Sequence, residues 1–208
     1  MLREEKRQGI SCVVATPHFY AHQDSPDRFV ARRMEAYDKL LQEMKDPQEF
    51  PEIRLGAEVY YFRGISECDE LELLKMEGTR YIMVEMPMAK WTDSMYRDLV
   101  GIREKQGLIP IVAHVDRYIA PFKTHGIPQR LAQLPVLVQA NASFFIRRST
   151  RPMALRMLKN DRIHLLGSDC HNMDSRPPRL ETALQIISRK LGTEALESIC
   201  ETQNQIYL

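Results

Sequence analysis

The sequence predicts an α/β protein built from parallel strands. Six short apolar runs alternate along the 208 residues with longer stretches whose apolar residues recur every three or four positions. Most of these runs are rich in Val and Ile, are bounded by Gly or Pro, and are too short for helices. Such alternation predicts right-handed crossovers between parallel strands, in a closed barrel or in an open doubly wound sheet.

The expected strands follow one another without a linker, a repeat or a low-complexity tract. A single domain over residues 1–208 is therefore expected. In chain order, the strands are expected at residues 12–16, 53–59, 81–85, 109–114, 136–141 and 163–168.

Three helices between the strands have clear start signals. Ser25-Pro26 predicts an N-cap followed by proline at the first helical position, Thr92 can cap a second helix, and Pro177-Pro178 opens a third. The residues expected to face the core are Val30, Met34, Tyr37, Leu41 and Met44 in the first, Met95, Leu99 and Ile102 in the second, and Leu180, Leu184, Ile187 and Leu191 in the third.

The first residues have the pattern of the end of a helix. The stretch from Leu2 to Gln8, closed by Gly9, matches two last helical turns with a C-terminal glycine. An α/β chain rarely begins with half a helix that leads into a buried strand. We therefore expect a missing first strand, and an ordinary short N-terminal helix is the alternative.

Composition narrows the class of protein. The chain has 29 Lys and Arg against 28 Asp and Glu, so no net basic field argues for nucleic acid or anionic lipid as a partner. No apolar stretch suits a signal peptide, and none approaches the roughly 18 residues of a membrane span. The four cysteines are scattered, as in reduced cytoplasmic proteins. We expect a cytoplasmic protein without membrane insertion, and the sequence leaves a homo-oligomer open.

Imidazole and carboxylate groups recur at the carboxyl ends of five of the six expected strands, where barrels and open α/β sheets build their sites. Each group alone could be a hydrogen-bonded core residue. Burying all of them without a metal would be costly, and His, Glu and Asp suit ions such as Zn, Mn and Fe. The predicted metal ligands are His18, Glu58, Glu85, His114, Asp169 and His171.

Details of spacing refine this set. Asp169 and His171 are two residues apart and would point to the same side of an extended chain, with Cys170 opposite. Arg117 and Arg176 lie in loops after two of the strands, where a guanidinium suits a phosphate group. Among the other histidines, His164 is expected to be structural, and both His22 and His125 are expected to be solvent-exposed.

These motifs together resemble the polymerase-and-histidinol-phosphatase (PHP) family, in particular its bacterial manganese-dependent tyrosine-protein phosphatases encoded with capsule and exopolysaccharide genes. The resemblance covers the whole chain. It rests on Ala-Thr-Pro-His18, Gly-Ala-Glu58, Glu85-Met-Pro, Ala-His114-Val-Asp-Arg117-Tyr and Ser-Asp169-Cys-His171-Asn172. The resemblance implies a distorted TIM-like (β/α) barrel with three metals at its mouth. Family members begin with a strand bearing a His-x-His pair, and this chain lacks it.

The resemblance also implies roles for individual residues. Glu58 would bridge two metals, Glu85 and His114 would complete a central site, and His18 would share a second site with His171. Asp169 would belong to the third, and Arg117 with Arg176 would hold the phosphoryl group. Manganese is the implied metal, although iron and zinc suit the same ligands.

Three functions compete on this basis. The leading one is metal-dependent hydrolysis of protein phosphotyrosine, with a polysaccharide-assembly tyrosine kinase as the substrate. The second is a phosphatase for small molecules of the histidinol phosphate kind. The third is an incomplete barrel that binds a partner or one metal without turnover, because ligands of the missing strand are absent.

Overall fold

The computed structural model describes residues 1–119 and 126–207, apart from the side chain of Tyr207, so that His125 lies outside the described residues. Contacts divide the chain into two compact units. The N-terminal unit comprises Leu2–Pro87 and Trp91–Pro110, and the C-terminal unit comprises Met88–Lys90 and Ile111–Leu208 together with Met1. The expectation of a single domain stays a prediction.

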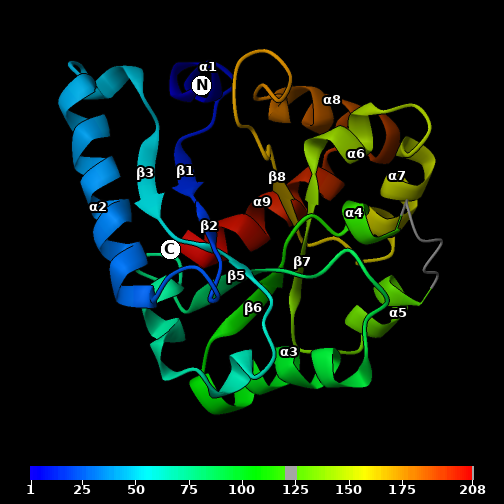
Figure 1. The fold of residues 1–208 in the computed structure, drawn as a ribbon. Helices are drawn as coiled ribbons and strands as arrows, with labels where there is room; N and C mark the ends of the chain where they lie inside the picture. Colours follow the sequence, from blue (N-terminus) through cyan, green and yellow to red (C-terminus); the bar gives the residue numbers. More distant parts are fainter. Residues whose placement is uncertain (120–125, 208) are drawn as a thin grey trace. The chain divides into compact units, whose positions relative to one another are not determined.

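The N-terminal unit alternates strands and helices as expected. Strand β1 pairs in parallel with β3 (Figure 1). Strand β4 lies between β2 and β5, again with parallel pairing. Its elements are α1 (Leu2–Arg7), β1 (Cys12–Ala15), β2 (His18–Phe19), α2 (Pro26–Glu43), η1 (Pro47–Glu49), β3 (Glu52–Leu55), β4 (Glu58–Tyr60), η2 (Ile65–Glu67), η3 (Asp69–Leu74), β5 (Tyr81–Glu85) and α3 (Asp93–Gln106).

The expected strand at residues 53–59 was wrong in one respect, because it is two strands, β3 and β4. Pro17 has no N–H and cannot continue a ladder, so β1 and β2 are also separate. The Gly56 N–H donates to the Ala15 carbonyl over 2.9 Å, and the Glu58 N–H donates to the Pro17 carbonyl over 3.0 Å. The segment from β1 to β2 and the segment from β3 to β4 are therefore interrupted at the same level, and the register between them is kept.

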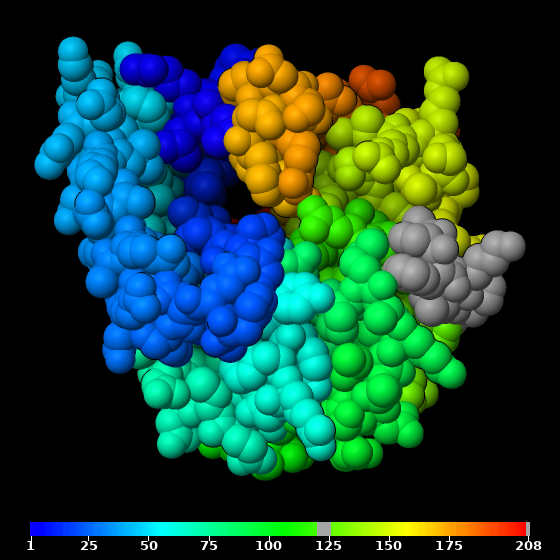
Figure 2. Space-filling view, in the orientation of Figure 1, coloured from blue at the N-terminus to red at the C-terminus, as the bar shows by residue number. Residues whose placement is uncertain are grey.

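Helix α2 begins as predicted, because the Ser25 hydroxyl accepts a hydrogen bond from the Arg28 N–H and Pro26 is the first helical residue. The predicted inward face was partly wrong. Met34 is 41% exposed and Leu41 is 43% exposed, whereas Phe29 is buried. The helix lies along the surface of its unit (Figure 2, blue), so only its first turn contributes a side chain to the core.

Helix α3 confirms its prediction more fully. Thr92 is the N-cap residue, and Leu99 and Ile102 have no exposed surface. The helix ends at Gln106 and is followed by Gly107, whose φ of 68° is left-handed and whose N–H donates to the Arg103 carbonyl. The helical pattern predicted for residues 2–8 is confirmed by α1, which is followed by Gly9 with a φ of 82°.

The C-terminal unit has the same construction. Strand β7 pairs in parallel with both β6 and β8. Its elements are β6 (Ile109–Val112), whose first two residues belong to the N-terminal unit, α4 (Asp116–Ile119), α5 (Ile127–Leu131), β7 (Leu137–Asn141), α6 (Ala142–Ile146), α7 (Arg151–Lys159), β8 (Leu165–Gly167), α8 (Leu180–Leu191) and α9 (Glu194–Tyr207).

The predicted elements of this unit are found with shorter bounds. Helix α8 begins at Leu180 and not at Pro177-Pro178, and its fully buried residues are Ala183 and Ile187. His164 precedes β8, and its Nδ1 accepts a hydrogen bond from the Val138 N–H over 3.0 Å, which confirms a structural role. No helix in the described ranges 1–119 and 126–207 is long and apolar enough to cross a membrane.

Candidate metal centre

Three predicted ligands meet on neighbouring strands of the N-terminal unit. The expectation that His18 and Glu58 end their strands was wrong, because His18 is the first residue of β2 and Glu58 the first residue of β4, and only Glu85 ends its strand, β5. His18 in β2 is the register partner of Glu58 in β4, and Glu85 in β5 lies two residues beyond Met83, the register partner of Glu58. Register partners and residues two apart share one face of a sheet. The pairing therefore directs His18, Glu58 and Glu85 to the same face.

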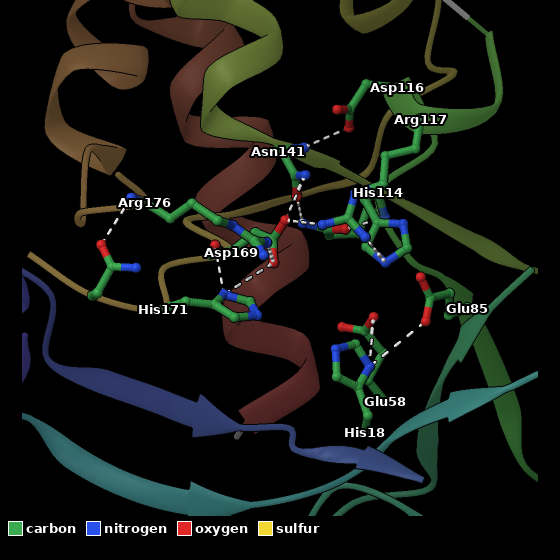
Figure 3. Close-up of polar contacts among 12 residues, drawn as sticks. His18, Glu58, Glu85, His114, Asp116, Arg117, Asn141, Asp169, His171 and Arg176 are labelled. Atoms are coloured by element: carbon green, nitrogen blue, oxygen red, sulfur yellow. Dashed lines mark hydrogen bonds and ion pairs between the residues drawn. The ribbon is translucent and has the colours of Figure 1, made fainter. Parts of the chain in front are cut away.

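The side chains of these three residues form a compact cluster (Figure 3). The Nδ1 atom of His18 lies 3.5 Å from Glu58 Oε1 and 3.6 Å from Glu85 Oε2. One ligand atom from each residue can be chosen so that all three lie within 4.8 Å of one another. The side chain of Glu58 is 10% exposed and that of Glu85 is 12% exposed. Two carboxylates this close and this buried need a nearby cation, and one imidazole with two carboxylates suits a borderline divalent metal.

The ring of Tyr20 packs against this cluster, and the negative charges of the cluster affect the pKa of its hydroxyl. The Tyr20 ring stacks on the His18 imidazole with 5.7 Å between centroids, and the Tyr60 ring lies 5.6 Å away. The pKa of Tyr20 is raised above its ordinary value, first by burial and then by the charges of Glu85 and Glu58. A cation bound by the carboxylates would offset this field.

A hollow of about 130 Å³ opens beside the cluster, within the same unit. It is lined by His18, Tyr20, Gln23, Asp24, Phe29 and Arg32. The side chain of His18 is itself 38% exposed. Solutes can therefore reach the imidazole from the side of α2.

The C-terminal unit gathers the other candidates around Asp169 (Figure 3). Arg117 Nη2 donates to Asp169 Oδ2 over 2.6 Å, and Asn141 Nδ2 donates to the same oxygen over 3.0 Å. Arg176 forms an ion pair with Asp169 Oδ1. Both predicted phosphate-binding arginines thus converge on one carboxylate, and each retains about a third of its side-chain exposure.

His114 occupies an unusual backbone position two residues beyond the end of β6. Its φ is 34°, in the left-handed region that non-glycine residues seldom adopt. The side chain is buried, with Nδ1 3.3 Å from the Tyr118 hydroxyl and Nε2 3.5 Å from Arg117 Nη1. Strained positions of this kind are frequent at functional sites.

The prediction that Asp169 and His171 lie on an extended chain was wrong. Asp169 has a φ of 49°, so the backbone turns directly after β8. His171 is exposed, and its Nδ1 lies 3.8 Å from Asp169 Oδ1. A turn centred on Asn172, whose Oδ1 accepts from the Arg176 N–H, returns the chain so that Arg176 reaches Asp169.

Four residues of these clusters had no role in the predictions. They are Tyr20, Asp116, Gln139 and Asn141. Asp116 accepts a hydrogen bond from the Asn141 N–H over 3.0 Å, and burial is the main cause that raises its pKa. Gln139 and Asn141 stand two apart at the end of an apolar strand, which is a signal for two polar groups on one face.

Each unit therefore brings its own candidates together. His18, Glu58 and Glu85 meet in the N-terminal unit, and His114, Arg117, Asp169, His171 and Arg176 lie near one another in the C-terminal unit. The implied sharing of metals between His18 and His171, or between Glu85 and His114, joins residues of different units and stays a prediction.

Parallel strands alternating with helices, and an imidazole–carboxylate cluster on three neighbouring strands, define an α/β protein with a candidate metal centre. The chain belongs to the family described as "Capsular polysaccharide synthesis, CpsB/CapC", which matches residues 1–208. This result confirms the family branch indicated by the motifs.

Two named relatives illustrate the similarity. The chain is 26% identical to the tyrosine-protein phosphatase CpsB of Streptococcus pneumoniae, over 96% of this chain and 84% of that protein. It is also 26% identical to the tyrosine-protein phosphatase YwqE of Bacillus subtilis, over 93% of this chain and 77% of that protein.

Solved structures support the fold. The chain resembles a structure from work on YwqE of Bacillus subtilis and CpsB of Streptococcus pneumoniae, described as unique metal-dependent tyrosine phosphatases. The TM-score is 0.84 at 22% identity, and the match covers 98% of this chain and 83% of the other. This likeness confirms the predicted fold class.

Proposed function

We propose that this protein is a metal-dependent tyrosine-protein phosphatase that serves capsular polysaccharide synthesis. The observation that carries the proposal is the cluster of His18, Glu58 and Glu85, whose ligand atoms lie within 4.8 Å of one another. Membership of the CpsB/CapC family and the names of the relatives support the reaction and its setting.

The donor set of the cluster fits a divalent metal. We assign His18, Glu58 and Glu85 as ligands in the N-terminal unit, and His114, Asp169 and His171 as ligands in the C-terminal unit. Manganese is the metal we propose, because imidazole and carboxylate ligands suit it. When bound, such an ion supplies Lewis acidity and offsets the charge of phosphate oxygens.

Arg117 and Arg176 are assigned to the phosphoryl group of the substrate. Each guanidinium already binds a carboxylate, Asp169, and the planar fork that suits a carboxylate also suits a phosphate. The substrate we propose is a phosphotyrosine of a tyrosine kinase of polysaccharide assembly. Phosphate, rather than the bulk of a peptide, is what these two side chains can recognise.

Substrate choice tests the proposal. The chain would be stripped with a chelator, resupplied with Mn(II), Fe(II) or Zn(II), and assayed with matched phosphotyrosine and phosphoserine peptides and with histidinol phosphate. We expect metal-dependent phosphate release, fastest with the phosphotyrosine peptide. Faster release from histidinol phosphate would favour the small-molecule phosphatase instead. Metal binding without release from any substrate would favour a binding domain, and activity unaffected by the chelator would refute the proposed function.

A further inference from the structure

A buried amide chain joins two of the proposed ligands in the C-terminal unit. Gln139 is 6% exposed and Asn141 is 5% exposed, at the end of β7. The Gln139 Oε1 atom accepts a hydrogen bond from the backbone N–H of His114. Its Nε2 donates to Asn141 Oδ1 over 3.2 Å, and Asn141 Nδ2 donates to Asp169 over 3.0 Å.

The direction of this chain follows from its first bond. A backbone N–H can only donate, so the atom of the Gln139 amide that faces His114 must be the oxygen. The nitrogen of the Gln139 amide then faces Asn141, which must present its own oxygen in return. The remaining Asn141 nitrogen is left to donate to Asp169, which accepts it as a carboxylate. Each amide is thus oriented by its neighbour.

Gln139 also holds the unusual backbone of His114 through its main chain. The backbone carbonyl of Gln139 accepts a hydrogen bond from the Val115 N–H over 2.9 Å. The side chain and the main chain of Gln139 therefore bind the N–H groups of two consecutive residues, His114 and Val115. The left-handed φ of 34° at His114 needs such support, because strained backbones persist only where surrounding contacts define them.

The fold leaves room for the Gln139 amide at one specific place. Gly167 in β8 is the register partner of Asn141, and a Cβ atom at Gly167 would collide with Gln139 Nε2. The amide is buried, so it cannot swing into solvent to avoid the collision. A side chain at position 167 would therefore disturb the amide without removing any polar group.

We propose that Gln139 is a positioning residue that fixes His114 and, through Asn141, Asp169 for metal binding. The inference rests on the proposed function, because it takes both residues as ligands. Partners of metal ligands typically contribute about 10–100-fold to metal affinity. The same range is expected for loss of the Gln139 amide.

The test measures Mn(II) binding from the EPR signal of the free ion, and thermal unfolding in a chelator, for the full chain and its variants. Gln139→Leu should raise the Mn(II) concentration at half-occupancy about 10–100-fold. Gly167→Ala should also raise the Mn(II) concentration at half-occupancy. If Gln139→Leu does not fold, the result for Gly167→Ala decides the test. Val138→Ala is the matched control, because Val138 is buried in the same strand and points to the opposite side.

The inference is overturned if Gln139→Leu and Gly167→Ala leave Mn(II) binding unchanged. It is also overturned if Val138→Ala weakens binding equally at a similar loss of thermal stability. His114→Ala separates this inference from the proposed function. If His114→Ala weakens Mn(II) binding and the Gln139 variant does not, only the positioning role falls. If His114→Ala has no effect on Mn(II) binding, both the positioning role of Gln139 and the assignment of His114 as a ligand are wrong.

Discussion

His18 and Glu58 face each other across the parallel register of β2 and β4, with 3.5 Å between His18 Nδ1 and Glu58 Oε1. This contact depends on register alone, because a slip of one residue would turn either side chain to the opposite face. The register is set by the hydrogen bonds around Pro17 and Gly56, where both neighbouring segments of the sheet are interrupted. A short irregular segment thus places the candidate metal centre.

Replacement of Glu58 by glutamine tests the centre directly. Glu58→Gln keeps the size of the side chain and removes its charge. Metal affinity should fall by more than the roughly 10–100-fold typical of a residue that acts only through a ligand. Metal content and phosphotyrosine peptide hydrolysis would be measured with Glu52→Gln as the control, since Glu52 is exposed and pairs with Arg54. Equal metal content in both variants would contradict the assignment of Glu58.

Removal of the arginines should affect turnover more than metal binding. For Arg117→Ala or Arg176→Ala, we expect the loss of a charged contact to a phosphate, worth about 1.5–3 kcal/mol in transition-state stabilisation. The measurement is kcat/KM for an aryl phosphate, together with Mn(II) affinity. Arg179→Ala, at an exposed position, serves as the control. Full activity in both variants would identify the two arginines as partners of Asp169 only.

The stability of the C-terminal unit should depend on the protonation of His164. Burial lowers the pKa of His164 below its ordinary value of 6.5, an effect that Asp161 partly opposes. Nδ1 must also be unprotonated to accept the Val138 N–H. The contribution of neutral His164 is therefore complete above pH 6.5 and is lost as the pH falls toward the lowered value.

This pH dependence can be assigned with one substitution. His164→Asn keeps an acceptor near the position of Nδ1 but does not titrate. Urea unfolding between pH 7.5 and about pH 5 should show a smaller loss of stability in this variant than in the unchanged chain. His22→Asn, at an exposed histidine, should leave the dependence as it was. Identical profiles for all three proteins would show that His164 does not contribute.

Replacement of Gly101 in α3 by alanine sets two effects on the free energy of unfolding against each other, helix propensity and packing. Alanine is favoured over glycine in a helix by about 1 kcal/mol. A Cβ atom at this position would lie 2.8 Å from Ser66 Cβ, and Ser66 is 3% exposed in η2. Overpacking typically costs about 1–3 kcal/mol, so Gly101→Ala should lower the free energy of unfolding. Adding Ser66→Gly should restore part of the loss, and a Gly101→Ala protein that is more stable would contradict the packing argument.

Local sequence was sufficient for the elements whose signals are contiguous. The strand at residues 81–85 is found with the predicted bounds, because an apolar run lies there between a turn at Gly78 and Pro87. The starts of α2 and α3 follow from Ser25-Pro26 and Thr92, whose effects act within one helical turn. The polar groups next to the apolar runs were visible for the same reason, but the breaks that make His18 and Glu58 the first residues of new strands were not.

Tertiary structure decided everything that depends on neighbours distant in sequence. The break of the strand expected at residues 53–59 follows from Pro17 in the neighbouring segment of the sheet. Met34 and Leu41 are exposed because other elements cover little of α2. Asp169 turned out to bind two arginines because a left-handed turn, invisible in the pattern, redirects it. The sequence determined which chemical groups lie in or next to the strands. The partner of each group was set by register and backbone strain, which arise only when the segments pack together.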